Sequence, residues 1–567
     1  MVKKYGLWYA VKYYKLIQLF ITAIVLYIAQ PYVFLLLCNL TQITERYMFY
    51  KLFYYTSYLI VIVAWFLISF ATLRSQRYKY LTSGRSYGKD SGKYNRTYTE
   101  LVEYFSDADP YKMDTEALPN IPWKQAEGMI LGKAKNGHLF NVNSGKDGKN
   151  YFIFGLPSSG KTAGPIICSC LRWGMHRPLS PHNKKTDGSV FCIDLKNDIW
   201  KATHKYRAIK RFTLMNPGKS CHFNPLAGIE KLSIDERCNF IENIGFNIIP
   251  DTGGGDGRYF RETAEDFWNG IALYLIDKSE CKISFPDIIK EILAGNAVDW
   301  VKKVVADGSE ESQRRLASKW GENEKNLSGG YSLLAQSCRK FASDKLFYLL
   351  GNDPQYEYIS VQTLEDGYDV YVQLDQAEIA NYAALLSMIV QSFLNGFINR
   401  ENNPKAGRLK DGTLRPICFM LDEFAQLSTL KYESIATAFM TLRSRNISIV
   451  CALQSRSSIA EMFHSENACA SLIDCVTTFC FLSIQEVATR KWASDLIGTH
   501  KVLKISNNLS DGSNGNKNQG RSVSEAREPI IFPADFGNLK DDSKGIDELI
   551  IYSQGKYLRA DKQYYFK

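Results

Sequence analysis

Residues 151–162 read YFIFGLPSSGKT, and this stretch constrains the fold more than any other part of the chain. Tyr151 to Phe154 form an aromatic, apolar run that predicts a short buried strand. Gly155 to Thr162 then follow the pattern G-x-x-x-x-G-K-S/T of a phosphate-binding loop. Because this pattern has its meaning only between a strand and a helix, it predicts an α/β nucleotide-binding fold.

The residue types in this loop explain the chemistry that we expect of it. Gly155 and Gly160 let the loop curl so that successive backbone N–H groups point at one anion, and the next helix directs its positive end at the same anion. Lys161 is expected to reach the β- and γ-phosphates of ATP, and the Thr162 hydroxyl to hold Mg²⁺. Pro165 predicts a short or bent start to that helix. The remaining candidate contacts of the loop are Pro157, Ser158 and Ser159.

Two later apolar runs end in polar residues that suit the same chemistry. Residues 417–421 read ICFML and precede Asp422-Glu423. We expect this strand to lie beside the phosphate-loop strand, with Asp422 holding Mg²⁺ through its water shell and Glu423 taking a proton from the attacking water. Residues 447–453 predict another buried strand, which ends at Gln454. The Gln454 amide is expected to sense the γ-phosphate, and a polar strand-end residue without a role is the open alternative.

Length and composition limit the remaining possibilities. The chain has 567 residues, too many for one hydrophobic core, so we expect at least two folded units. Its 13 cysteines are scattered and include no C-x-x-C pair, which indicates free thiols in a reducing compartment. The net charge of +10 permits an anionic partner, nucleic acid or lipid head groups, without selecting one.

Two uncharged runs near the N-terminus predict a membrane anchor at residues 1–75. Residues 16–40 and 52–73 are each long enough to cross a bilayer as a helix. Basic residues precede the first run and follow the second, so the positive-inside rule places the N-terminus and everything after residue 73 in the cytoplasm. The polar residues 76–98 are expected to form a juxtamembrane linker. The basic residues that set this orientation are Lys3, Lys4, Lys12, Lys15, Arg74, Arg77, Lys79 and Arg85.

The rest of the chain divides by its hydrophobic periodicity. Residues 99–229 and 351–567 contain the strand-like runs and are expected to form the nucleotide-binding domain together. Residues 230–350 repeat apolar side chains at helical spacing and predict an inserted all-α domain. Residues 504–527 are rich in Ser, Asn and Gly, which predicts a surface loop or a disordered segment.

Taken in order, these parts resemble the type IV secretion coupling proteins, the TraG/TraD-like ATPases of conjugation. The resemblance rests on the two N-terminal runs and on GLPSSGKT, IDLKND, FNPL, LDEFAQL and ALQS. It implies a RecA-like P-loop NTPase domain carrying an all-α domain, in a homo-hexamer held in the bacterial cell membrane by two transmembrane helices. It also implies that ATP hydrolysis drives relaxase-bound single-stranded DNA, or protein, into the type IV secretion channel.

The resemblance also implies roles for individual residues. Lys161 and Glu423 are expected to serve hydrolysis, and Gln454 to couple hydrolysis to movement. Arg445, with Arg443 as the alternative, is expected to reach the γ-phosphate held by a neighbouring subunit, as arginine fingers do in other nucleotide hydrolases.

The segment at residues 194–198 departs from the family pattern, and two other functions stay open. The chain has Asp194-Leu-Lys-Asn-Asp198 where the family often has Asp-Pro-Lys-Gly-Glu, so the role of that loop is undecided. The first alternative function is a duplex-DNA translocase of chromosome segregation. The second is a membrane scaffold that binds nucleotide without turnover, which the Asp422-Glu423 pair argues against.

Overall fold

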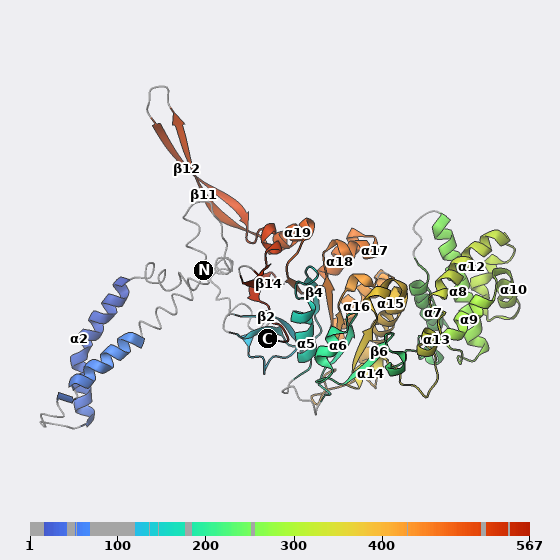
Figure 1. Cartoon of the computed structure of the whole chain (residues 1–567), viewed down its shortest axis with the longest axis horizontal. Coiled ribbons are helices and arrows are strands. Elements are labelled where there is room, and N and C mark those ends of the chain that lie inside the picture. The colour runs from blue at the N-terminus through green and yellow to red at the C-terminus, as the bar shows by residue number, and fades with distance from the viewer. Residues whose placement is uncertain are drawn as a thin grey trace. The chain divides into compact units, whose positions relative to one another are not determined.

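The computed structural model describes residues 16–41, 51–52, 54–67, 120–134, 137–145, 147–175, 184–250, 256–427, 429–511, 517–542 and 545–566. Figure 1 shows the helices and strands of the chain, which divides into two compact units. Unit 1 comprises Met1–Met113, Ser494–Ile531 and Lys556–Arg559. Unit 2 comprises Asp114–Ala493, Phe532–Gly555 and Ala560–Lys567.

A mixed β-sheet is the framework of the nucleotide-binding fold, and most of it is parallel. The parallel strands run in the order β10 (Thr478–Phe481), β4 (Asn150–Phe154), β9 (Ile447–Leu453), β8 (Ile417–Leu421), β5 (Ser189–Ile193), β7 (Asp369–Gln373) and β6 (Ile209–Thr213). Strands β4, β5, β7, β8, β9 and β10 are buried along their whole length, which explains their continuous apolar sequences. Beyond β10 the sheet continues with β14 (Ile546–Ser553), β15 (Lys556–Asp561), β2 (Met129–Lys133), β3 (Leu139–Val142) and β1 (Asn120–Ile121), and β13 (Lys540–Asp541) pairs with β14.

The position of β8 corrects one expectation. Strand β9 pairs with β4 on one side and with β8 on the other, so the strand that ends in Asp422-Glu423 does not lie beside the phosphate-loop strand. Hydrophobic periodicity identifies a buried strand but not its neighbours, because pairing between distant strands is decided by tertiary packing. All three strands are parallel, so their carboxyl ends still meet at one edge of the sheet.

Helices connect the strands of the sheet. They are η1 (Thr162–Ile166), α5 (Ile167–Arg172), α6 (Asp198–Thr203), η5 (Gln376–Glu378), α15 (Ile379–Gly396), η6 (Arg400–Asn402), η7 (Phe424–Gln426), α16 (Tyr432–Thr441), η8 (Leu442–Arg445), α17 (Ser457–Phe463), α18 (Glu466–Asp474), α19 (Val487–Ile497) and η9 (Pro533–Gly537).

Between β6 and β7 the described residues contain helices and no strand. These helices are η2 (Pro217–Lys219), η3 (Ile229–Lys231), α7 (Ile234–Ile248), α8 (Asp256–Lys278), α9 (Phe285–Ala294), α10 (Ala297–Asp307), α11 (Glu310–Leu316), η4 (Ala317–Lys319), α12 (Glu324–Arg339), α13 (Asp344–Leu349) and α14 (Val361–Glu365). Ser233 begins α7 with a capping box that includes Glu236. Trp268 of α8 is fully buried and donates a 2.9 Å hydrogen bond to the carbonyl of Ile241, so it is a core residue as its spacing indicates. The helices belong to the same compact unit as the parallel strands.

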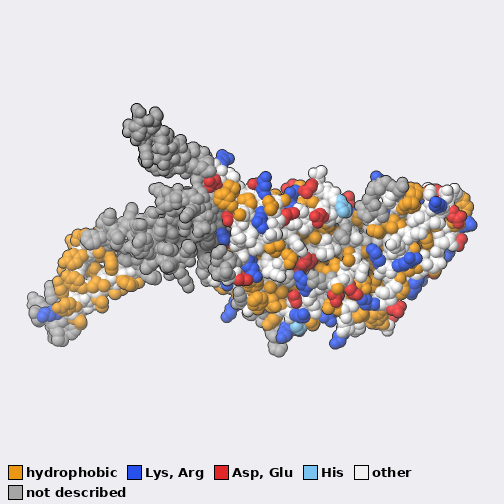
Figure 2. Space-filling view, turned by 45° about the horizontal axis from the view of Figure 1, so that its top comes forward, with side chains coloured by type: hydrophobic (Ala, Val, Ile, Leu, Met, Phe, Trp, Pro, Cys, Tyr) orange, Lys and Arg blue, Asp and Glu red, His pale blue; other side chains and the backbone are white. Residues whose placement is uncertain are grey.

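In unit 1, α2 (Leu16–Thr41) and a second helical stretch at residues 54–67 contact each other through polar side chains and through the edge-to-face rings of Phe34 and Tyr54. Gln30 and Ser57 are buried and joined by a 2.8 Å hydrogen bond. Phe34 is buried, but many other large apolar side chains of these helices are exposed, and Figure 2 shows orange surface there; the exposed ones include Ile24, Val25, Ile28, Leu35, Leu36, Leu59, Ile62, Phe66 and Leu67. Over the described residues alone, no helix combines the length and the apolar character needed to cross a bilayer. Residues 68–73 and the expected linker at 76–98 lie outside the described residues.

Unit 1 also contains a long antiparallel hairpin, β11 (Thr499–Asp511) paired with β12 (Lys517–Pro529). The prediction of a loop or disordered segment at 504–527 is therefore wrong for the residues described. Composition misled the prediction because ladder hydrogen bonds between neighbouring segments use backbone groups and need no apolar face.

Candidate active site

The phosphate loop follows β4 at the carboxyl edge of the sheet and adopts the backbone that its glycines predict. Gly160 has φ +95°, a left-handed conformation that disfavours side chains, and Ser158 also lies in that region at φ +62°. A Cβ on Gly160 would lie 2.9 Å from the hydroxyl of Tyr564, so the position excludes a side chain on two counts.

The helix after the loop begins irregularly, as Pro165 predicts. Residues Thr162–Ile166 form a π-helical turn in which Gly164 leaves helical geometry (φ −93°, ψ −105°), and regular α-helix begins only at Ile167. A proline one residue after this glycine removes a backbone donor, which accounts for the bend.

Lys161 is buried within the loop that it belongs to. Its ammonium donates hydrogen bonds to the carbonyl of Gly155 and, at 3.1 Å, to that of Leu156. Burial lowers the pKa of Lys161, and the nearby carboxylates of Glu423 and Asp422 oppose that shift. The ammonium group of Lys161 therefore lies inside the phosphate loop, where it would contact a phosphate group bound there.

Thr162 and Asp422 are 260 residues apart in the sequence but are in contact in the structure. The Thr162 hydroxyl donates a 2.8 Å hydrogen bond to Oδ2 of Asp422, whose Oδ1 is buried without a hydrogen-bond partner among the described residues. Burial raises the pKa of Asp422 to about 6, although the hydrogen bond from Thr162 opposes the shift. An orphaned carboxylate oxygen beside a hydroxyl oxygen fits Mg²⁺, a hard cation that takes oxygen ligands and is usually bound through few protein groups.

Glu423 follows Asp422 in a strained backbone conformation. Its φ of +66° and ψ of +48° are left-handed, which is rare for a residue with a Cβ and is typical of functional sites. Lys196 approaches it from the loop after β5, with Nζ 3.7 Å from Oε1 of Glu423. Asp194, at the start of that loop, accepts hydrogen bonds from the backbone N–H groups of Ile199 and Trp200 and so caps α6. The loop at residues 194–198, whose role the sequence does not decide, therefore places Lys196 next to Glu423, the predicted general base.

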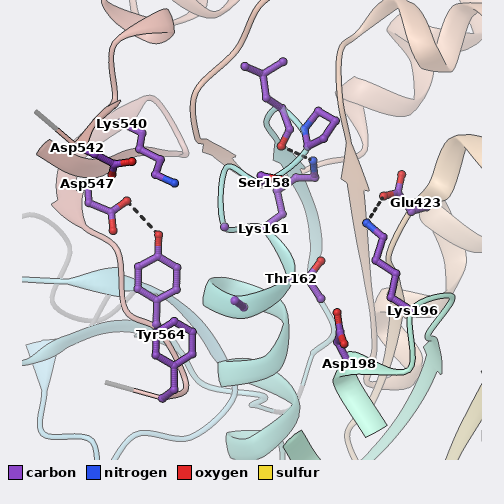
Figure 3. A pocket seen from close by; sticks show the side chains of 15 residues that line it. Ser158, Lys161, Thr162, Lys196, Asp198, Glu423, Lys540, Asp542, Asp547 and Tyr564 are labelled. Carbon is purple, nitrogen blue, oxygen red and sulfur yellow. Dashed lines mark hydrogen bonds and ion pairs between the residues drawn. The ribbon is translucent and has the colours of Figure 1, made fainter. Parts of the chain in front are cut away.

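One pocket of about 570 Å³ joins these groups (Figure 3). Lys196 and Glu423 line one side of it, and Lys161 and Thr162 lie in the middle. The opposite side is made by residues far along the chain, which the sequence did not identify: Lys540, Asp542, Asp547, Tyr564 and Phe566. Their only sequence signal is the aromatic run YYF at 564–566, which by itself indicates a terminal strand.

Comparison with known proteins identifies the family of the chain. Residues 112–567 match the family described as "Type IV secretory system Conjugative DNA transfer". The chain belongs to this family of coupling proteins.

Relatives and solved structures agree with that assignment. The conjugal transfer protein TraG of Agrobacterium fabrum is 24% identical over an alignment of 481 residues that covers 81% of this chain and 66% of the relative. The coupling protein VirD4 of Bartonella henselae is 20% identical over an alignment of 476 residues that covers 81% of this chain and 69% of the relative. The chain thus spans about two thirds of these relatives' length.

Solved structures of the coupling protein TrwB share the fold. The unbound monoclinic form of TrwBdeltaN70 has a TM-score of 0.53 at 14% identity, covering 78% of this chain and 90% of that one. TrwB with a non-hydrolysable ATP analogue has a TM-score of 0.54 at 13% identity, covering 79% and 96%.

In this coupling protein, Gln454 lies at the end of β9, where the sequence places it. It is exposed and lines a second cavity, of about 310 Å³, together with Glu423, Gln426 and Ser458. The structure thus brings Gln454 and Glu423 to one cavity, a position that suits a residue expected to sense the γ-phosphate.

The two candidate arginine fingers lie at the other edge of the sheet. They belong to η8, which precedes β9, and the carbonyl of Arg443 accepts a 2.8 Å hydrogen bond from the N–H of Gly148, just before β4. Since β9 has seven residues, this turn and the carboxyl edge are about 20 Å apart. Neither Arg443 nor Arg445 can therefore act on the phosphate loop of its own chain.

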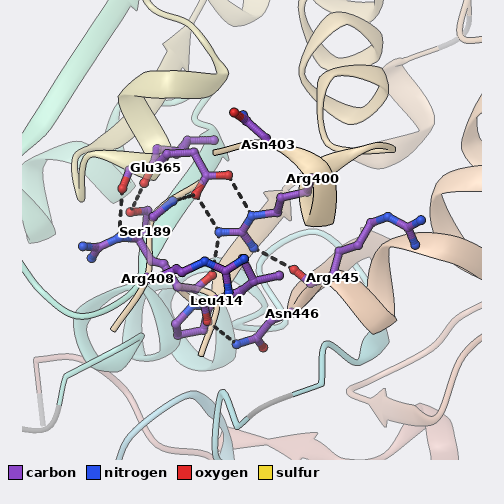
Figure 4. A network of polar contacts seen from close by, with 12 residues as sticks. Ser189, Glu365, Arg400, Asn403, Arg408, Leu414, Arg445 and Asn446 are labelled. Carbon is purple, nitrogen blue, oxygen red and sulfur yellow. Dashed lines mark hydrogen bonds and ion pairs between the residues drawn. The ribbon is translucent and has the colours of Figure 1, made fainter. Parts of the chain in front are cut away.

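The two arginines differ in their surroundings. Arg445 donates from Nε to the carbonyl of Ile398 and from Nη1, at 2.8 Å, to that of Thr441. Its own carbonyl accepts a 2.7 Å hydrogen bond from the buried Arg400 (Figure 4). The side chain of Arg443 is exposed. Contacts within the chain thus engage the guanidinium of Arg445, whereas Arg443 projects from a well-anchored turn.

Proposed function

We propose that this protein is a membrane-anchored ATPase that couples a relaxase–DNA substrate to a type IV secretion channel. It would drive conjugative transfer of single-stranded DNA, or protein, by ATP hydrolysis. The observation that carries the proposal is the 2.8 Å contact between Thr162 and Asp422, beside a pocket that Thr162 lines together with Lys161 and Glu423. Phosphate binding, metal binding and a proton acceptor are thereby combined at one site.

The nucleotide would be held by the backbone N–H groups of residues 155–162 and by Lys161. Thr162 and Asp422 would hold Mg²⁺, which when bound neutralises charge on the phosphates. TrwB has been solved with a non-hydrolysable ATP analogue and with ADP and Mg²⁺, which supports the same ligands for a chain of this fold.

Glu423 would accept a proton from the attacking water, because it lines the pocket directly after Asp422 and is only half-buried. Glu423 lines the pocket and pairs with Lys196, whereas Asp422 is buried and pairs with Thr162, so the two carboxylates can serve different purposes. Gln454 would report the presence of the γ-phosphate to the moving parts of the assembly.

Arg443 would complete the site of a neighbouring copy. Because η8 and the phosphate loop lie at opposite edges of the sheet, an arginine finger must come from another subunit, which supports a ring-shaped homo-oligomer such as a hexamer. We assign the finger to Arg443 in preference to Arg445, since the Arg445 guanidinium already pairs with carbonyls of its own chain.

The N-terminal helices would anchor the protein in the bacterial cell membrane, with the N-terminus and the ATPase domain in the cytoplasm. Two uncharged runs in the sequence support this proposal, as does the distribution of side chains in unit 1. Gln30 and Ser57 pair between the helices while leucine and isoleucine face outward, an arrangement that suits lipid on the outside and would be unfavourable in water.

ATP hydrolysis by the full-length protein in detergent, with and without single-stranded DNA, tests the proposal. We expect turnover that rises with DNA and is lost in both Lys161→Ala and Glu423→Gln, with Glu423→Gln still binding ATP. Nucleotide binding without turnover would establish the scaffold function instead. Stimulation by duplex DNA but not by single strands would favour the chromosome-segregation translocase.

A further inference from the structure

The C-terminal segment lies directly against the start of the phosphate-loop helix. The N–H of Tyr565 donates a 3.2 Å hydrogen bond to the carbonyl of Ala163. The carbonyl of Gln563 lies 3.2 Å from the position that a Cβ on Gly164 would occupy. Small residues at 160, 163 and 164 thus allow a distant part of the chain to form a wall beside the phosphate loop.

Two aromatic side chains of this segment form an ordered pair. The Tyr564 hydroxyl donates a 3.0 Å hydrogen bond to Oδ1 of Asp547, which fixes the ring. The Phe566 ring stacks on it with the centroids 5.3 Å apart and an interplanar angle of 17°. Tyr564 is 8% exposed, whereas Phe566 is 62% exposed although it lines the pocket. Phe566 therefore presents an apolar ring to the pocket, supported by a rigid neighbour.

The direction of the pocket determines which part of a nucleotide would meet these rings. Glu423 and Lys196 lie on one side of Lys161 and Thr162, and Tyr564 and Asp547 lie on the other (Figure 3). With the γ-phosphate directed at Glu423, the ribose and base extend toward Tyr564. The volume of about 570 Å³ lies within the range of pockets that hold ligands of nucleotide size.

We propose that Phe566, backed by Tyr564, is the platform on which the purine base of the bound nucleotide stacks. The inference rests on the proposed nucleotide-binding function and assigns the base end of the same site. A stacked aromatic pair recognises the π-face of a base and tolerates different bases. Lys540 and Asp542, on the same side of the pocket, supply a cation and a carboxylate within reach of the ribose or the base edge.

Comparison of a ligand that has a base with one that has none tests this assignment. The full-length protein in detergent is titrated calorimetrically with ADP and with inorganic tripolyphosphate. We expect Phe566→Ala to weaken ADP binding about tenfold and to leave tripolyphosphate binding unchanged, with Phe566→Trp restoring the affinity for ADP. Tyr565→Ala is the matched control, because Tyr565 is 41% exposed, is not among the residues that line the pocket and holds Ala163 through its backbone.

Each contrary outcome has a distinct meaning. Unchanged or tighter ADP binding in Phe566→Ala would overturn the platform, and tighter binding would identify the ring as an occupant of the base site. Equal weakening for ADP and tripolyphosphate would show a general loss of the pocket and would also reject the assignment. If the wild-type protein bound neither ligand, the proposed function itself would fail, and the platform with it.

Discussion

The hydroxyl of Thr162 donates a hydrogen bond to Oδ2 of Asp422 across 260 residues of sequence. The contact links the phosphate loop to the end of β8 although β9 separates their strands. Burial nevertheless raises the pKa of the Asp422 carboxyl against the effect of this hydrogen bond, and its Oδ1 has no hydrogen-bond partner among the residues described.

Asp422→Asn is expected to stabilise the protein at pH 8 when no divalent cation is present. The pKa of Asp422 rises from 3.8 to about 6 on folding, so its contribution to stability is fully present below pH 3.8 and is lost as the pH rises through about 6. Two pKa units correspond to about 3 kcal/mol at most. Thermal unfolding in EDTA at pH 8 and pH 4.5 measures the difference, which should shrink at the lower pH. Asp198→Asn, in the same pocket, is the control, and a stabilisation that is independent of pH would contradict the prediction.

Arg443→Ala is expected to lower ATP turnover, whereas Arg445→Ala is expected to lower the stability of the fold. Loss of Arg443 should lower turnover by about 10³-fold while ATP binding and stability stay unchanged, because arginine fingers act on the transition state. Loss of Arg445 should cost about 1 to 3 kcal/mol of stability, since the carbonyl of Ile398 loses the Arg445 donor and that of Thr441 loses one of its donors.

Mixed assemblies test whether Arg443 acts between subunits. Arg443→Ala subunits keep an intact phosphate loop, and Lys161→Ala subunits keep an intact finger, so mixing them should recover part of the turnover. Absence of any recovery, in assemblies shown to contain both subunits, would argue against a finger supplied in trans.

Arg400→Met is expected to destabilise the nucleotide-binding unit by about 3 to 5 kcal/mol. Arg400 donates two 2.7 Å hydrogen bonds to Glu365, and both side chains are fully buried, so the variant leaves a carboxylate without its cation. Urea unfolding measures the loss. The double variant Glu365→Leu/Arg400→Met should be more stable than Arg400→Met alone, because it removes the uncompensated charge. Additive effects of the two substitutions would refute this account.

Gly160→Ala is expected to weaken nucleotide binding and to cost more stability than Gly412→Ala. Both glycines have positive φ, +95° and +85°, but only the Cβ at 160 would meet another group, the ring of Tyr564. Gly412→Ala therefore reports the conformational cost alone, about 1 kcal/mol. Equal losses in the two variants would mean that Tyr564 yields to the added methyl group.

Local patterns in the sequence predicted the parts of the site that are local in structure. GLPSSGKT follows β4 and Asp422-Glu423 follow β8, as their local patterns predict, and helical periodicity predicted the helices between β6 and β7. The order of β4, β9 and β8 was beyond such patterns, because strand pairing depends on contacts between segments far apart. The contact of residues 563–566 with the phosphate loop was not predicted for the same reason. The hydrogen bonds of the Arg445 guanidinium were not predicted, because they go to backbone carbonyls, which every residue has and which no sequence pattern marks.

The contact of residues 563–566 with the start of the phosphate-loop helix also sets the order in which the pocket can form during translation. Cys168 and Gln563 touch across 395 residues, which a ribosome adds in roughly 20 to 80 s at ordinary rates of synthesis. Until β9 and β10 have been synthesised, the apolar strand β4 has neither of the strands with which it pairs. Until residues 563–566 have been synthesised, the phosphate loop lacks its contact with them. A complete pocket for ATP would thus form only after residues 563–566 have been added, and the exposed strand is where we expect a chaperone to bind the nascent polypeptide.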